Sequence, residues 1–334
     1  MVPTCNRVDL LPLTLHTVLW QQGVEFEVFV VDDGSTEDLR RAVPELDDPR
    51  IRLLRNSTPQ GVSRARNRAV AEAGGRWVAF LDDDDLWAPT KLMAQVTAAE
   101  TAGRGWSYAG AVNVSEDLRL LGGAPPADPS AVVAELRRTN AVPGGCSGVV
   151  VLRELLASNP FDPSYRHFAD WDLWIRLSQL DQPVAVSDPL VGYRIHSSNA
   201  SLDTDGMVAE LHEIERRYGG PVDRAQFYRH VARVSLRVSR FRAAVRYLCQ
   251  AAASDREYRR DEFAPDIYEV AQNAARSVRH GLARAVLHRP VDLTPPQRRR
   301  YAAQQPWIER ARPWIDALKP YRNDILQRTR TGPT

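Results

Sequence analysis

The sequence contains four consecutive carboxylates at positions 82–85, directly after the apolar run 77–81. The length and composition of that run predict a buried strand. Like charges this close together raise one another's pKa unless a cation or hydrogen-bond donors compensate them. The acidic run therefore indicates either ligands for a metal or a phosphate group, or a solvated turn or helix N-cap, where Asp is also favoured.

A second acidic pair, Asp32 and Asp33, ends the apolar segment 25–31. Predicted helices over 10–22, from Ser35 or Thr36, and over 61–74 alternate with predicted strands that include 51–54. This alternation predicts an α/β fold with a mostly parallel sheet flanked by helices. Ligands of such sheets sit beyond the carboxyl ends of the strands. Both acidic clusters fall at those ends, which favours a functional role over a solvated turn.

Further elements follow the acidic run. A helix is predicted over 90–102, a strand over 106–115 and a loop over 119–130. A Gly-rich turn at 142–148 then leads into a strand at 149–151.

Composition excludes several classes of protein. The net charge of +2 over 334 residues argues against nucleic acid as a partner. Neither a Gly-x-Gly-x-x-Gly motif after the first strand nor a phosphate-binding loop of the Walker type is present, which disfavours dinucleotide oxidoreductases and P-loop enzymes. The three cysteines lack metal-ligand spacing and favour a reducing compartment. Without a signal peptide or a span of ~20 apolar residues, we expect a cytoplasmic protein, at most peripheral at the inner face of the membrane.

Four short segments follow one another along the chain: 3–7 (PTCNR), 30–36 (VVDDGST), Gly61 with 65–67 (ARN), and 80–85 (FLDDDD). Together they resemble family 2 glycosyltransferases with the A-type fold, over roughly residues 1–200. The resemblance implies a nucleotide-diphosphate sugar donor, a divalent cation on its diphosphate, and transfer to an acceptor hydroxyl. The family usually has a longer first apolar strand than Val2 provides, so we expect the natural protein to begin a few residues earlier.

The resemblance assigns the nucleoside side of the donor site. Asp33 would accept the imide proton of a uracil or thymine ring, which points to a UDP- or dTDP-sugar. Pro3, Thr4 and Asn6 belong to the segment that lines the same pocket. Asp32 and the Arg66-Asn67 pair would shape the pocket and the diphosphate side. The alternatives are a satisfied turn carboxylate for Asp32 and a helix-surface ion pair for Arg66.

The resemblance also places the Asp-x-Asp pattern of the family on the acidic run. Asp84 would bind Mg²⁺ or Mn²⁺, hard cations that prefer carboxylate and phosphate oxygens. Asp82 or Asp83 would reach ribose or sugar hydroxyls. Asp85 would cap the helix that contains Lys91.

A later segment, 193–196 (YRIH), looks like the family's Tyr-Arg-x-His piece. His196 would reach the metal or the diphosphate. Arg194 would support the charge of the leaving group.

Asp170 matches the catalytic aspartate of the family, with Ala169 in place of the usual Glu. It would take the proton of the acceptor hydroxyl as that oxygen attacks the anomeric carbon, so the configuration inverts. Its alternative role is a helix N-cap. The chain lacks the Gln-x-x-Arg-Trp signature of processive synthases, which favours transfer of one sugar per encounter.

We expect a catalytic domain over 1–202, a helical region over 203–328 and a disordered tail over 329–334. An apolar stripe from Phe227 to Leu248 predicts one helix, and 267–286 a second. Residues 295–318 are predicted to be helical, with breaks at Pro306 and Pro313. The Arg-rich faces could contact anionic lipid or a lipid-linked acceptor, or could simply be solvated.

Two other functional classes use similar residues. A nucleotidyltransferase also places paired Asp side chains at a parallel sheet, but it needs a Gly-rich triphosphate loop that this sequence lacks. A non-catalytic sugar-nucleotide-binding protein would keep the pocket without turnover. The acceptor itself, whether a saccharide, a lipid-linked sugar or a small molecule, and the oligomeric state have no signature in the sequence.

Overall fold

The computed structural model describes the chain except residues 197–202, 238, 281–301, 303 and 332–334. The chain divides into two compact units. The first contains residues 1–136, 140–195 and 301–334, and the second contains residues 137–139 and 196–300. The predicted boundary at residue 202 therefore lies a few residues late, and the predicted C-terminal region is not one unit.

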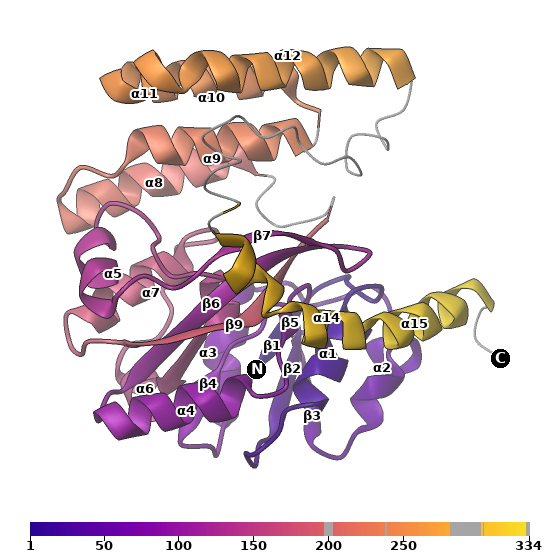
Figure 1. Cartoon of the computed structure of the whole chain (residues 1–334). Helices are drawn as coiled ribbons and strands as arrows, with labels where there is room; N and C mark the ends of the chain where they lie inside the picture. Colours follow the sequence, from indigo (N-terminus) through magenta and orange to yellow (C-terminus); the bar gives the residue numbers. More distant parts are fainter. Residues whose placement is uncertain (197–202, 238, 281–301, 303, 332–334) are drawn as a thin grey trace. The chain divides into compact units, whose positions relative to one another are not determined.

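The first unit is built on two adjoining sheets (Figure 1). The parallel sheet has the order β1-β2-β3 and contains β1 (Val2–Thr4), β2 (Val28–Asp32) and β3 (Ile51–Arg55). The mixed sheet has the order β4-β8-β6-β9-β5 and contains β4 (Trp77–Ala79), β8 (Val149–Leu152), β6 (Trp106–Ser115), β9 (Val184–Ile195) and β5 (Leu86–Trp87). The Met1 amine donates to the Ala79 oxygen and Leu81 N–H donates to the Met1 oxygen, so β1 connects the two sheets.

Helices flank this layer as the sequence predicts. Their bounds are α1 (Leu11–Leu19), α2 (Leu39–Ala42), α3 (Val62–Glu72), α4 (Lys91–Ala102), α5 (Pro129–Glu135), α6 (Arg153–Ser158) and α7 (Ala169–Ser178), with 3₁₀ turns η1 (Pro44–Asp47) and η2 (Gly145–Gly148). The mixed α/β fold with a parallel sheet is therefore confirmed. The second half of the layer differs in that β8 runs antiparallel to both β4 and β6.

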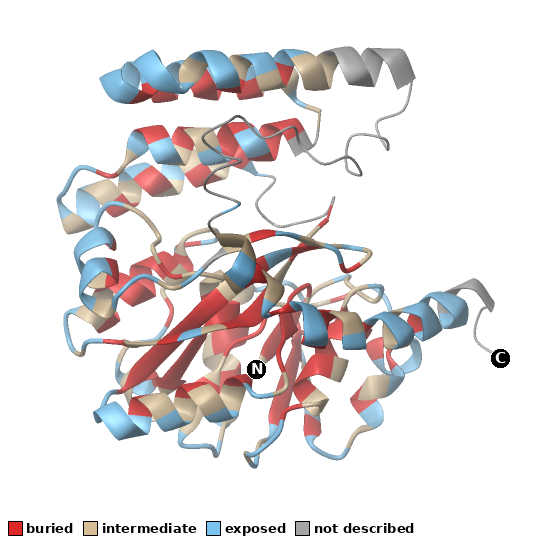
Figure 2. Cartoon of the chain, viewed as in Figure 1, coloured by how far each residue is buried: buried red, intermediate tan, exposed pale blue. Residues whose placement is uncertain are grey.

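The core lies between the sheets and the helices that cover them (Figure 2). All five residues of β2 are buried, as expected for a central strand covered on both faces. On α1, Leu11, Leu15 and Val18 are buried at helical spacing against this strand. Full burial of each such side chain stabilises the fold by about 1.5–3 kcal/mol. This packing fixes the carboxyl ends of the strands, where the acidic clusters lie.

Two local predictions are wrong. The predicted loop over 119–130 contains a strand, β7 (Leu120–Ala124), which pairs antiparallel with β6. Extended glycines allow this pairing where composition suggested a loop. The helix predicted from Ser35 or Thr36 begins only after Asp38, because the Asp38 carboxylate accepts the Arg40 N–H at 3.1 Å and caps a single turn.

The end of the chain returns to the first unit, which corrects the predicted extent of the helical region. In α14 (Arg312–Ala317) the Trp314 indole donates to the Pro189 oxygen of β9 at 3.1 Å. A turn at 310–311 separates the helical residues 304–309 from α14, so the break predicted at Pro313 is confirmed, and Pro313 occupies the first turn of α14, where a missing N–H costs nothing. α15 (Lys319–Thr331) lies alongside α1, with Tyr321 stacked on His16 at 3.6 Å (Figure 1). Helix therefore continues three residues into the tail that was predicted to be disordered.

The second unit is helical, as predicted. It contains α8 (Thr204–Tyr218), α9 (Arg224–Arg237), α10 (Phe241–Ser254), α11 (Arg256–Asp261) and α12 (Phe263–His280). The apolar stripe predicted as one helix is divided between α9 and α10, because Ser239 adopts a left-handed φ of 58° and turns the chain. The two helices pack against each other. The parts of the two helix predictions that fall on residues 281–286, 295–301 and 303 lie outside the described residues.

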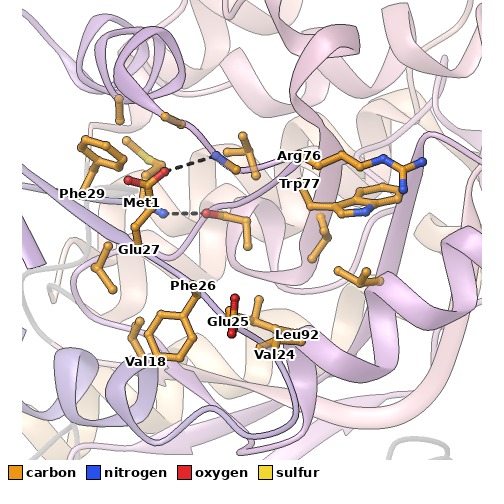
Figure 3. A pocket seen from close by; sticks show the side chains of 18 of the residues that line it. Met1, Val18, Val24, Glu25, Phe26, Glu27, Phe29, Arg76, Trp77 and Leu92 are labelled. Carbon is orange, nitrogen blue, oxygen red and sulfur yellow. Dashed lines mark hydrogen bonds between the residues drawn. The ribbon is translucent and has the colours of Figure 1, made fainter. Parts of the chain in front are cut away.

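A cavity of about 360 Å³ opens beside the start of β1 (Figure 3). Phe26, Trp77 and Leu92 are among its apolar lining residues. The Met1 amine faces it, and burial lowers the pKa of that amine to about 5. None of the acidic residues at 32, 33 and 82–85 lines this cavity. It is not the site predicted from the sequence. No helix in the described part of the chain is long and apolar enough to cross a membrane.

Candidate active site

The first acidic pair lies at the carboxyl end of β2. Asp32 is fully buried, its Oδ1 accepts Ser35 N–H at 2.8 Å, and its Oδ2 lies 3.1 Å from Arg55 Nη1. Asp33 is held by the loop after β3: its carboxylate accepts Asn56 Nδ2 at 2.7 Å and Gly61 N–H at 2.7 Å, and it also accepts Gln60 N–H. The charges of this pair are therefore met by an arginine and by several N–H donors.

The segment after β1 lies beside this pair. Pro3 and Thr4 are buried and stand in register with Val31 and Asp32. Asn6 has a left-handed φ of 55°, and its side-chain oxygen accepts Thr36 N–H at 2.8 Å. Asn6 thus ties the loop after β1 to the turn after β2. The residues predicted to line the nucleoside pocket are adjacent in space.

Arg66 and Asn67 have different surroundings although they are neighbours on α3. Arg66 is buried, donates to Asp82 Oδ1 at 2.6 Å, and lies over the Phe161 ring at 5.2 Å. Its Nε atom has no hydrogen-bond partner among the described residues. The Asn67 amide bonds both backbone groups of Phe161, at 2.8 and 2.9 Å. Arg66 bonds the acidic run, whereas Asn67 holds the segment that contains Phe161, whose ring packs against Arg66.

The acidic run lies between β4 and β5 and carries more negative charge than its neighbours balance. Burial and the charge of Asp84 raise the pKa of Asp83 to about 7. Arg7 Nη1 lies 3.8 Å from Asp84 Oδ2, which is a loose ion pair. A raised pKa in a carboxylate shows that its charge is incompletely compensated.

Asp85 does not cap a helix, which corrects the sequence prediction; the N-cap of α4 is Thr90. Asp85 is buried and accepts Ser147 Oγ–H at 2.6 Å and Arg194 N–H at 3.2 Å. Burial, followed by the charge of Asp84, raises its pKa well above the usual range. Ser147 also accepts Asp82 N–H at 3.1 Å, so one hydroxyl joins both ends of the run.

Arg194, near the end of β9, holds the backbone of the same run. Its guanidinium donates to the carbonyl oxygen of Asp84, and to the Leu10 oxygen and Thr14 Oγ1 at 2.9 and 2.8 Å. Thr14 in turn donates to the Asp83 oxygen at 2.9 Å. The guanidinium is therefore engaged by carbonyl oxygens behind the acidic run. His196 follows β9 after Ile195, is buried, and belongs to the second unit.

The chemistry of the donor set fits a divalent cation. Asp82 and Asp84 present carboxylate oxygens, which hard cations prefer, beside two carboxylates whose pKa is raised. Within the described residues, no three or more His, Cys, Asp or Glu side chains are grouped to hold a metal by themselves. A cation here would therefore take most of its ligands from a bound diphosphate and water, as magnesium usually does in phosphate sites.

Asp170 lies in the first turn of α7, and the N-cap is Phe168, so the alternative role of Asp170 as an N-cap is wrong. Its Oδ1 accepts Trp171 N–H at 2.7 Å, and its Oδ2 accepts Asn140 Nδ2 at 3.2 Å. Burial raises the pKa of Asp170, with the charge of Arg66 opposing that rise. A partly buried carboxylate with a raised pKa is suited to accepting a proton near neutral pH.

The Gly-rich turn η2 adjoins Asp170. A Cβ on Gly145, which has φ +54°, would lie 3.2 Å from Asp170 Oδ2, and a Cβ on Gly148 would lie 2.2 Å from the Pro143 oxygen. The backbone of this turn therefore packs closely against the aspartate. Cys146, within the turn, is buried and free, and burial raises the pKa of its thiol.

Three polar residues in this region were not predicted from the sequence: Asn56, Asn140 and Ser147. Each lies in a loop or turn and belongs to no motif with a recognisable spacing. Only the fold brings them to Asp33, Asp170 and Asp85 respectively. The Gly-rich context of Ser147 was the one local signal that could have drawn attention to it.

Comparisons with solved structures define the class of fold. The chain is similar to Staphylococcus aureus TarS 1-349 in complex with UDP-GlcNAc, with a TM-score of 0.50, 17% identity, and coverage of 98% of this chain and 90% of that one. It is also similar to the mannosyltransferase PcManGT from Pyrobaculum calidifontis in complex with GDP-Man and Mn²⁺, with a TM-score of 0.51, 18% identity, and coverage of 93% and 84%. The fold is that of an A-type glycosyltransferase.

Comparisons of sequence give the family. Residues 1–144 match the family described as Glycosyl transferase family 2. One relative is the Escherichia coli UDP-Glc:alpha-D-GlcNAc-diphosphoundecaprenol beta-1,3-glucosyltransferase WfgD, 28% identical over 218 residues, which cover 65% of this chain and 82% of that protein. Another is the putative teichuronic acid biosynthesis glycosyltransferase TuaG of Bacillus subtilis, 28% identical over 60% of this chain and 80% of that protein. These matches support a glycosyltransferase of family 2, with the family pattern in residues 1–144.

Proposed function

We propose that this glycosyltransferase moves one sugar from a UDP- or dTDP-sugar to an acceptor hydroxyl with inversion, and that the reaction depends on a divalent cation. The observation that carries the proposal is the grouping of three features. The acidic run, Arg66 and Asp170 surround one region, in which Arg66 bonds Asp82 and its charge acts on the Asp170 carboxyl. Diphosphate binding and proton removal are thereby possible at neighbouring positions.

On the donor side, Asp33, Pro3 and Thr4 form the nucleoside pocket of the proposal, with Asn6 and Asp32 shaping its loops. Because Asn56 and the Gln60 and Gly61 N–H groups already hold the Asp33 carboxylate, its orientation is fixed before a base arrives. A fixed carboxylate that accepts an imide proton selects uracil or thymine over bases without one.

Asp84 is the proposed metal ligand, with His196 as a second, and Asp82 or Asp83 would bind donor hydroxyls. Mg²⁺ or Mn²⁺ bound here would neutralise charge on the leaving diphosphate. Arg194 holds the Asp83 and Asp84 carbonyl oxygens and so keeps the run in the shape that such binding needs. Its support for the leaving group would then be exerted through the run rather than by direct contact.

Asp170 is the proposed general base. As the acceptor oxygen forms its bond to the anomeric carbon, the bond from that carbon to the diphosphate oxygen breaks. The electron pair leaves with the diphosphate, and the hydroxyl proton passes to Asp170. The Trp171 N–H and the Asn140 amide hold the carboxylate, yet each of its oxygens keeps a lone pair that can take the proton.

The acceptor we propose is a sugar linked to a lipid diphosphate. The WfgD relative supports this choice, because its name describes transfer to a diphosphoundecaprenol-linked sugar. Transfer would be non-processive and would occur at the cytoplasmic face of the membrane, with peripheral contact through Arg-rich faces of the helical unit. The putative role of TuaG in teichuronic acid synthesis supports the same cell-envelope setting.

The test begins with thermal shifts over a panel of nucleotide sugars with and without Mn²⁺, since a ligand at about 100 times its Kd stabilises by about 2.7 kcal/mol. The selected donor is then assayed with wild type and Asp170→Asn. We expect transfer by Asp170→Asn to fall by about 10²- to 10⁴-fold while the donor-induced shift is kept. Near wild-type transfer by that variant would exclude Asp170 as the base, and a protein that binds donors without any turnover would be a non-catalytic binding protein.

A further inference from the structure

Among the described residues, Asn140 is the one side chain that donates a hydrogen bond to the Asp170 carboxylate. Its Nδ2 lies 3.2 Å from Oδ2. It lies between α5 and η2, on the segment before the Gly-rich turn. The other bond to the carboxylate comes from the Trp171 backbone, which belongs to the same helix as Asp170. Asn140 is therefore the side-chain contact that links the proposed base to a different segment of the chain.

Two further contacts fix Asn140 in relation to Asp170. The Trp171 indole donates to the Leu136 oxygen at 2.5 Å, which ties α7 to the end of α5, four residues before Asn140. On the other side, Gly145 leaves only enough room for the carboxylate, because a Cβ there would lie 3.2 Å from Oδ2. Oδ2 is therefore confined between the Asn140 amide and the glycine backbone.

The other half of the Asn140 amide is unused. Its Oδ1 is buried and has no hydrogen-bond partner among the described residues. Burying an acceptor without a partner is unfavourable, so such atoms are rare unless a ligand or water completes them. This oxygen is covalently fixed to the same amide that holds Asp170, a geometry that places one hydrogen-bond acceptor beside the base.

We propose that Asn140 is a positioning residue for Asp170 and also a specificity-determining residue for the acceptor, a proposal that rests on the function proposed above. Its NH₂ group orients the carboxylate and stabilises the ionised form. Its Oδ1 accepts a hydroxyl or amide N–H of the acceptor sugar, next to the hydroxyl that attacks. An acceptor sugar with two neighbouring O–H or N–H groups would then form hydrogen bonds with both Asp170 and Asn140. These two bonds would fix the attacking oxygen relative to the base.

The experiment compares wild type with Asn140→Ala, Asn140→Asp and Asn140→Ser, using UDP-glucose as donor, octyl N-acetyl-α-D-glucosaminide as acceptor, and singly deoxygenated versions of that acceptor. Asn273→Ala serves as a matched control, because Asn273 is an asparagine of the helical unit that bonds its own helix at Glu269. kcat, both KM values and the pH–rate profile are measured for transfer and for hydrolysis of the donor by water.

We expect Asn140→Ala to lower kcat for transfer by about 10- to 100-fold with the donor KM within about twofold of wild type. The acidic limb of its pH–rate profile should move to higher pH, because the ionised base loses a donor. Asn140→Asp should move that limb further by adding a like charge, and Asn140→Ser should recover part of the loss. One deoxygenated acceptor should be as poor with wild type as with Asn140→Ala, whereas the two losses would multiply if they were independent.

Wild-type kcat and pH profile in Asn140→Ala would overturn the positioning role. Losses that multiply for every deoxygenated acceptor would overturn the contact to the acceptor. Both results leave the proposed function intact if Asp170→Asn is inactive. Activity in Asp170→Asn would instead remove the base assignment itself, so the two failures are distinguishable.

Discussion

The two acidic clusters of this protein occupy equivalent places, at the carboxyl ends of β2 and β4, yet their surroundings compensate their negative charge to different extents. Asp32 and Asp33 are met by Arg55, Asn56 and backbone N–H groups of two turns. In the acidic run 82–85, burial and mutual repulsion raise the pKa of Asp83 and Asp85. The comparison supports the proposal that the first cluster is a structural framework, whereas the second cluster needs a cation to balance its remaining charge.

The largest expected effect comes from removing a charge from the second cluster. Asp84→Asn should lower kcat/KM by about 10³-fold or more, because a carboxylate that holds the catalytic cation is lost. Its Tm without metal should equal or exceed that of wild type, since a repelling charge disappears.

Asp33→Asn, unlike Asp84→Asn, should destabilise the metal-free protein. It should lower the free energy of unfolding by about 1–3 kcal/mol, because N–H donors of the loop after β3 lose a charged acceptor. Asp47→Asn, an exposed aspartate on η1, is the control for both variants. The proposed difference between the two clusters would be wrong if Asp84→Asn destabilised the metal-free protein as much as Asp33→Asn does.

An intermediate effect is expected from Ser147→Ala. The Ser147 hydroxyl joins the Asp85 carboxylate to Asp82 N–H, so its loss should loosen both ends of the acidic run. We expect about a 10-fold fall in kcat/KM, weaker activation by Mn²⁺, and a loss of about 1–2 kcal/mol in stability. Titration of activity with Mn²⁺ checks this, with Ser254→Ala, an exposed helix-end serine, as control. Unchanged activation by Mn²⁺ would mean that Ser147 does not shape the run.

The last effect concerns the stability of the protein as a function of pH in the absence of metal. The pKa of Asp83 rises from about 3.9 in an unfolded chain to about 7 in the fold, so the folded state binds more protons between these values. The free energy of unfolding should therefore be highest at low pH with respect to this group and should fall as pH rises through 7. Melting in EDTA from pH 5 to pH 8 measures the slope, and Asp83→Asn should flatten it. A steeper slope in that variant would contradict the raised pKa.

Much of the fold could be predicted because the signals were local. The apolar strands at 28–32 and 106–115, and the helices between them, follow from periodicity and from glycine at the helix ends. The C-terminal segment could not be placed, because whether Trp307 and Trp314 pack within a separate helical region or on β9 depends on contacts more than 100 residues away.

The candidate site divides in the same way. Asp32, Asp33 and Asp84 could be proposed from the sequence because charged residues that follow apolar runs are visible there, whereas Asp170 was proposed from its match to the family motif. The roles of Asp85 and Arg194 were not, because only the structure turns the first toward Ser147 and the second toward the backbone of the acidic run. Asn140 had no signal at all, since a single loop asparagine gains meaning only from its bond to Asp170.

The most direct test of the contrast between the two clusters is Mn²⁺ binding measured by electron paramagnetic resonance in the presence of UDP, for wild type, Asp84→Asn and Asp33→Asn. We predict that wild type binds Mn²⁺, that Asp84→Asn loses this binding, and that Asp33→Asn retains it at saturating UDP although it needs more UDP. Retained Mn²⁺ binding in Asp84→Asn, together with its loss in Asp33→Asn at saturating UDP, would place the cation at the first cluster and contradict the account.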